Sequence, residues 1–61
     1  MTEREIYIEF VIQGNFAKAT AIDSVTGTEA SIMGPAGSPR EPLAQAAVRK
    51  LKYVLEKDKK G

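Results

Sequence analysis

The chain has 61 residues, of which 43% are hydrophobic, and a formal net charge of +1 at pH 7. It contains no cysteine and no histidine, which excludes disulfides, thiolate or imidazole catalysis and the usual zinc sites. We therefore expect no enzymatic activity, no metal site and no cofactor. A chain of this size buries only about 60% of the surface that its unfolded form exposes. We expect a single small domain over residues 1–61, with self-association as a source of additional stability.

The charge is distributed unevenly along the chain. Residues 1–39 carry two basic and five acidic side chains, and residues 40–61 carry seven basic and three acidic ones. Basic residues are stabilising near a helix C-terminus, and the same cluster is also compatible with an anionic partner. No signal-peptide pattern opens the sequence, and no run approaches the ~20 apolar residues of a membrane span. The sequence thus predicts a soluble cytoplasmic protein.

Residues 5–13 alternate strictly between two faces, which is the pattern of a half-buried strand. The apolar face carries four side chains: Ile6, Ile8, Phe10 and Ile12. Gly14-Asn15 follows, a two-residue hairpin signal in which the glycine supplies a positive φ. This turn places Gln13 opposite Phe16 and fixes the register with a second strand over residues 16–23.

The second strand continues the apolar face with small side chains. In the register set by the turn, the apolar residues of the first strand lie opposite three alanines: Ala17, Ala19 and Ala21. Such an alanine column in a central strand leaves room for a helix to lie close to the sheet.

A second hairpin is predicted before a third strand over residues 28–33. Asp23 can accept hydrogen bonds from the loop amides, and Gly27 can take the left-handed conformation that closes the turn. Pairing Asp23 with Thr28 brings Ala30 and Ile32 onto the face of the alanine column. Two independent turn signals therefore give one consistent core face.

The last predicted element is a helix over residues 39–57. Ser38 can be its N-cap and Glu41 can complete a capping box, so that the helix begins at Pro39. The alternative is a helix whose first residue is Pro42. Apolar residues then recur with a helical period: Leu43, Ala47, Leu51, Val54 and Leu55.

These elements predict an α+β fold of the β-β-β-α type. The strands form a three-stranded antiparallel meander in the order 1-2-3, and the C-terminal helix packs on one face. Residues 58–61 are expected to form a frayed tail. Because one helix covers only one side of the sheet, the opposite face and the two outer strand edges stay open.

The uncovered face carries more apolar residues than solvent exposure alone selects. Its candidate contact residues are Tyr7, Val11, Phe16, Ile22 and Met33. We interpret them as the surface of a small non-catalytic interaction module, which pairs with a second copy or another protein through this face or a strand edge. The alternative interpretation is an ordinary mixed face, because scattered exposed apolar residues are common.

A second hypothesis is that nucleic acid or another anionic partner binds the basic end of the helix. Its candidate residues are Arg49, Lys52, Lys57, Lys59 and Lys60. No aromatic pair of the kind that stacks bases on a sheet accompanies them. Protein association is therefore the leading hypothesis.

Two further motifs carry little functional information. The segment 34–38 before the helix has the glycines of a phosphate cradle, but two prolines remove backbone donors there and Glu41 adds a negative charge. Glu5 and Glu9 lie too far apart along a strand to act as a catalytic carboxylate pair.

Most of the chain, from about Glu5 to Leu55, resembles a family of short, uncharacterised alphaproteobacterial proteins. The resemblance rests on these segments: Gly14-Asn15, Ala21-Ile22-Asp23, Thr26-Gly27-Thr28-Glu29, Gly34-Pro35-Ala36, Pro39-Arg40-Glu41 and Leu51 to Leu55. It implies a β-β-β-α arrangement and no established activity, so no functional residue can be carried over. Some members bear a serine hydroxymethyltransferase label, but that enzyme needs a large pyridoxal-phosphate fold that nothing in this chain supplies. Pro42 and the alanine-rich second strand depart from the family pattern.

Overall fold

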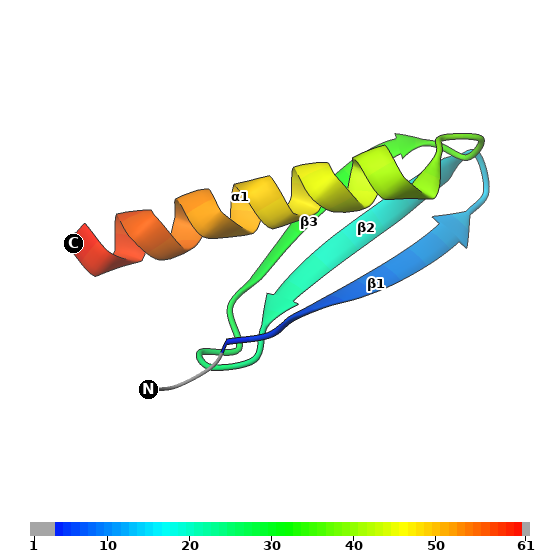
Figure 1. The fold of residues 1–61 in the computed structure, drawn as a ribbon. Coiled ribbons are helices and arrows are strands. Elements are labelled where there is room, and N and C mark those ends of the chain that lie inside the picture. The colour runs from blue at the N-terminus through cyan, green and yellow to red at the C-terminus, as the bar shows by residue number, and fades with distance from the viewer. Residues whose placement is uncertain (1–3, 61) are drawn as a thin grey trace.

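The computed structural model describes residues 4–60, with side chains up to residue 57. Three strands and one helix follow one another: β1 (Ile6–Gln13), β2 (Phe16–Asp23), β3 (Glu29–Pro35) and α1 (Arg40–Lys60). The strands form an antiparallel sheet in the order β1-β2-β3, and α1 crosses one face of it obliquely (Figure 1). The predicted α+β fold and meander topology are confirmed. We call the face covered by α1 the inner face and the opposite one the outer face.

The register of the sheet is the one that the turns predicted. Gln13 pairs with Phe16 across β1 and β2, and Ala21 pairs with Ala30 across β2 and β3. Gly14 has a φ of 55°, a conformation that glycine adopts without steric cost. Because side chains alternate along a strand, this register fixes which residues share each face.

The second turn is organised by Asp23, as its sequence predicted. The Thr26 N–H donates to the Asp23 carboxylate at 2.9 Å, and the Gly27 N–H donates to the Asp23 carbonyl at 2.8 Å. Gly27 takes a φ of 78°, so the left-handed residue of the turn is the glycine. The Asp23 side chain thereby forms an Asx-type turn, in which a carboxylate oxygen takes the place of a backbone acceptor.

The strand ends differ slightly from the predicted ones. β3 runs to Pro35 rather than to residue 33, because Phe16 pairs with Pro35 and a proline is tolerated on an edge strand. β1 and β3 begin at Ile6 and Glu29, one residue later than predicted, a difference within the usual uncertainty of strand ends.

The helix differs from its prediction at both ends. α1 begins at Arg40, rather than at Pro39 or at Pro42. It extends through Lys60, three residues beyond its predicted end, and the last residue of the predicted tail lies outside the described residues. No glycine or proline interrupts the final turns, and lysine favours the negative end of the helix dipole.

Ser38 does not cap the helix as predicted. Its Oγ lies against Gly34, where an added Cβ would be 2.9 Å from it, and its N–H donates to the Pro35 carbonyl at 2.9 Å. Among the hydrogen bonds of the described residues, none joins Ser38 to Glu41, so the predicted capping box is not formed. The residue serves the turn between β3 and α1 instead.

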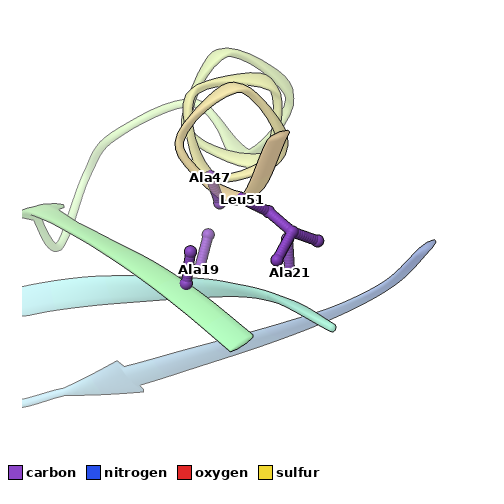
Figure 2. Close-up of a cluster of buried hydrophobic side chains, with 5 residues drawn as sticks. Ala19, Ala21, Ala47 and Leu51 are labelled. Carbon is purple, nitrogen blue, oxygen red and sulfur yellow. The ribbon is translucent and has the colours of Figure 1, made fainter. Parts of the chain in front are cut away.

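The core lies between α1 and the central strand. The three alanines of β2 are fully buried, as are Ala47 and Leu51 on the helix. Figure 2 shows Leu51 reaching from α1 toward Ala21. Leu51 is the one large apolar side chain that is fully buried among the described residues. The alanine column thus lets the helix approach the sheet, but the resulting core is small.

The helix leaves part of the inner face uncovered. It packs on β2 and β3 and touches β1 little. Ile8 and Ile12, which β1 presents on this face, are 42% and 60% exposed. A helix is about 10 Å wide and strands lie about 4.8 Å apart, so one helix covers two strands. The predicted core face is therefore buried over β2 and largely covered over β3, but over β1 it is covered only in part, because Ile6 and Phe10 pack against the core and Ile8 and Ile12 do not.

Candidate interaction surface along β1

The outer edge of β1 presents unpaired backbone groups. The Ser24 N–H donates to the Glu5 carbonyl at 2.9 Å, and bonded pairs alternate with non-bonded pairs along an antiparallel ladder. The residues whose N–H and C=O point away from β2 are therefore the four apolar ones: Ile6, Ile8, Phe10 and Ile12. No hydrogen bond of the described residues uses these groups. β1 thus has a free edge ready for a further strand.

The side chains next to this edge are also apolar and partly uncovered. Ile8 and Ile12 are exposed, whereas Phe10 between them is half-buried. The guanidinium carbon of Arg40 lies 4.9 Å from the centroid of the Phe10 ring, so a charged side chain covers the one aromatic residue of the strip. We call Ile8, Phe10 and Ile12, with their free backbone groups, the β1 strip.

The edge of β3 is partly blocked by contrast. The Asp23 N–H donates to the Thr28 carbonyl at 2.9 Å, so by the same alternation Ser31 turns its backbone outward. The Nζ of Lys50 donates to the Ser31 carbonyl at 3.0 Å, which takes one acceptor from this edge. Pro35 has no N–H to offer, and the charge of Glu29 also disfavours pairing at this edge.

The five predicted contact residues lie on the outer face, in two groups. Tyr7 and Ile22 pair near the second turn, and the other three lie toward the first turn: Val11, Phe16 and Met33. All of them are exposed except Ile22, which is half-buried. The register thus places them on one face of the sheet but does not bring them together.

A polar row separates these two groups. Glu9, Thr20 and Ser31 lie side by side across the three strands, and the hydroxyls of Thr20 and Ser31 are 2.9 Å apart and hydrogen-bonded. A shallow hollow of about 160 Å³ lies over this row and is lined mostly by polar and charged side chains. The outer face therefore offers no continuous apolar patch, and its contact role stays a prediction.

A buried carboxylate holds the start of β1 to the second turn. Asp23 is fully buried, its Oδ1 lies 2.8 Å from the Arg4 Nε, and its Oδ2 accepts hydrogen bonds from Thr26. Burial acts to raise the pKa of Asp23, but the hydrogen bonds from Thr26 and the charge of Arg4 outweigh it. The pKa of Asp23 therefore lies below its ordinary value of 3.8, and the group is ionised at neutral pH.

Part of the predicted basic surface lines a larger hollow. Between the C-terminal half of α1 and the second turn lies a hollow of about 840 Å³, bordered by Arg4, Arg49, Lys52 and the exposed Tyr53. The Nζ of Lys57 lies 5.8 Å from the centroid of the Tyr53 ring, beside this hollow. The other two predicted residues, Lys59 and Lys60, have side chains outside the described ones. The sequence missed Arg4 here because it lies far from the helix along the chain.

The described residues hold neither a metal-binding cluster nor a membrane-spanning helix. No group of three or more acidic side chains is placed to hold a metal ion in this part of the chain. The helix that the structure describes lacks the apolar length needed to cross a membrane.

The sequence was also compared with known proteins. A family defined as a domain of unknown function, DUF6898, matches residues 3–58. Neither a curated protein nor a solved structure matches the chain.

Proposed function

The chain belongs to the DUF6898 family, whose function is unknown, and we propose that it is a protein-interaction module that accepts an extended strand along β1. The observation that carries this proposal is the β1 strip. It combines exposed isoleucines on the inner face with free backbone groups along the same strand. Strand addition draws its affinity from main-chain hydrogen bonds and its specificity from alternate side chains, and the β1 strip offers both.

The composition of the chain supports a role in binding rather than catalysis. Without histidine or cysteine, the chain lacks the usual general bases and nucleophiles. We accordingly propose a non-catalytic role and a cytoplasmic location for this chain. We also propose that its relatives are short alphaproteobacterial proteins. We do not extend a serine hydroxymethyltransferase activity to this chain.

A pair of labelled peptides tests the proposal. One peptide has the sequence of residues 5–13, and the second is identical except for N-methyl groups at Ile8 and Ile12, which remove two backbone donors. We expect fluorescence anisotropy to show micromolar binding of the first peptide to the dilute protein. Binding of the second peptide should be at least tenfold weaker.

Matched protein variants locate the contact. Ile12→Lys on β1 and Met33→Lys on β3 introduce the same charge at side chains of nearly equal exposure, 60% and 61%. Ile12→Lys should abolish peptide binding, and Met33→Lys should leave it unchanged. Equal binding of both peptides, or equal effects of both variants, contradicts strand addition at β1.

A second candidate function is binding of an anionic partner at the basic hollow. The observation that favours it is the convergence of Arg4, Arg49 and Lys52 from two distant parts of the chain. Glu56 also lines the hollow and lowers its net positive charge. Contacts between basic side chains and phosphates weaken steeply with salt, which separates this function from strand addition.

A filter-binding assay with mixed RNA and DNA at low salt tests this second function. We expect micromolar binding that falls at least tenfold between 50 and 200 mM salt, as order-of-magnitude counterion release predicts for about two phosphate contacts. Arg49→Ala with Lys52→Ala should abolish it, whereas Lys18→Ala on the outer face should not. Absence of binding at micromolar protein removes the candidate.

A further inference from the structure

We infer that the strand accepted by the β1 strip is β1 of a second copy, paired antiparallel about a twofold axis at Phe10. This inference rests on the proposed function and names its partner. Pairing of this kind would join two three-stranded sheets into one continuous sheet with a helix toward each end. The argument uses the surface area of the chain, the symmetry of the free edge and the charges along β1.

The chain exposes more surface than a compact monomer of its mass. A compact monomer of this mass exposes about 3,900 Å², whereas the chain exposes 4632 Å². The excess is roughly 700 Å², and a typical interface takes about 800 Å² from each partner. The C-terminal part of α1, which diverges from the sheet (Figure 1), accounts for some of this excess, and the uncovered β1 strip for another part.

The free edge is complementary to itself. In antiparallel pairing, residues with outward backbone groups must face residues of the same kind, and on β1 these are the even-numbered positions. A twofold axis at any residue of the strand satisfies this condition, because residues placed symmetrically about an axis have the same parity. Backbone geometry therefore permits several registers, which differ in the side chains that they bring together.

Charge and burial select one register. An axis at Glu9 sets two carboxylates directly opposite each other on the outer face, which is destabilising. An axis at Ile8 leaves Ile12 opposite Arg4, and an axis at Val11 leaves Ile8 opposite Gly14. An axis at Phe10 alone places Ile8 beside Ile12 of the second copy, so the two exposed isoleucines cover each other.

The same register brings apolar rows together on the inner face, where the Arg40 side chains that lie over the two facing Phe10 rings also come near each other. On the inner face, Ile8 and Ile12 of the second copy continue the rows that end in the buried alanines of the two β2 strands. On the outer face, Glu9 lies opposite Val11 and Tyr7 lies opposite Gln13, so no like charges meet. Pairing through β3 instead is disfavoured, because Lys50 occupies the Ser31 carbonyl and Pro35 lacks an N–H.

The absence of native cysteine permits a direct test with Glu9→Cys and Val11→Cys. With the axis at Phe10, positions 9 and 11 form a directly opposed, non-hydrogen-bonded pair about 4.5 Å apart, within the range for a disulfide. After mild oxidation of an equimolar mixture, mass spectrometry should show the mixed disulfide at least fivefold over either homodimer. Met33→Cys, similarly exposed on β3, is the control and should form no preferred disulfide.

Other disulfide patterns overturn the register. A Glu9→Cys homodimer as the main product places the axis at residue 9, and a Val11→Cys homodimer places it at residue 11. A purely statistical mixture shows that β1 does not pair with β1.

Sedimentation equilibrium of the unmodified chain tests the partner. We expect a species of twice 6.6 kDa, at least tenfold weaker association for Ile12→Lys, and no change for Met33→Lys. A monomer up to high micromolar concentration overturns the second copy as partner. If the peptide of residues 5–13 still binds in that case, the proposed function stands without this inference; if neither associates, both fail.

Discussion

The two edges of the sheet differ in how far their backbone groups are free to pair, although both belong to strands of similar length. The outer strand β3 packs against the helix, carries a proline and has one edge carbonyl occupied by Lys50. The β1 edge has free backbone groups on four apolar residues and a single charged residue within the strand, Glu9. Natural sheets protect edges that must not pair. The contrast supports the proposal that β1 is the edge that pairs.

The placement of the helix produces this contrast. Ala17, Ala19 and Ala21 are fully buried beneath α1, whereas Ile8 and Ile12 project from the neighbouring strand on the same face. The small side chains of β2 let the helix pack closely on that strand. The large side chains of Ile8 and Ile12 on β1 lie outside the area that the helix covers. The covered half of the inner face supplies stability, and the uncovered half remains available for contacts.

The largest expected effect tests the covered half. Leu51→Ala removes the main large side chain from the core and should cost about 2–5 kcal/mol, which is comparable to the roughly 3–5 kcal/mol available to so small a core. We therefore expect a largely unfolded chain by circular dichroism. Val48→Ala, at a half-buried position on the helix flank, should cost only about 1 kcal/mol. A Leu51→Ala chain that folds and unfolds at the same urea concentration as Val48→Ala would contradict the central place of Leu51 in the core.

A smaller effect is expected where β1 joins the second turn. Asp23→Asn removes the ion pair with Arg4 and should lower the melting temperature at pH 7 less than Leu51→Ala does, since the amide keeps one oxygen for Thr26. Because the folded pKa of Asp23 lies below 3.8, the carboxylate contributes stability above that pH and loses it as pH falls through the folded pKa. The difference between wild type and variant in thermal melts should therefore shrink as pH drops below 3.8. A constant difference down to pH 2 would show that charge is not its cause.

The sheet register is the part of the structure that the sequence predicted best. Gly14 and Gly27 mark the two turns, and strand periodicity then leaves one pairing that puts the alanines on a common face. These signals are local, so they can be recognised without knowing the tertiary contacts. The position of α1 over the alanine column follows from the same reasoning.

The candidate surface was harder to predict because it depends on the width of the helix relative to the sheet rather than on the alternation of apolar residues. Ile8 and Ile12 alternate as core residues do, and nothing in their spacing tells that the helix stops short of them. Counting one helix against three strands could have revealed the shortfall. The basic hollow likewise depends on Arg4 meeting Arg49 and Lys52 across the fold, which no local spacing encodes.

The smallest expected effect concerns the protected edge. Lys50→Ala frees the Ser31 carbonyl and should cost about 1 kcal/mol or less, the usual net value of one exposed hydrogen bond. The substitution should also change how the chain assembles. Because β3 could then pair as well as β1, light scattering should detect species larger than a dimer at high concentration. Lys52→Ala, a nearby helix lysine without that bond, is the control and should scatter like wild type. If Lys50→Ala also behaves like wild type, the closure of the β3 edge lies in Pro35 and Glu29 rather than in this lysine.

Under the proposed pairing, the alanine column makes the quaternary state depend on side-chain volume rather than on the backbone. The same three strands and helix could be redesigned as a closed monomer by moving bulk between neighbours: larger residues in place of Ala17 and Ala21, and small polar ones in place of Ile12 and Ile8. The helix would then shift from β2 toward β1, because it packs closest to the strand with the smallest side chains. If chains pair along β1 as proposed, a few methyl groups on two adjacent strands would therefore decide how many chains complete the interior of this architecture.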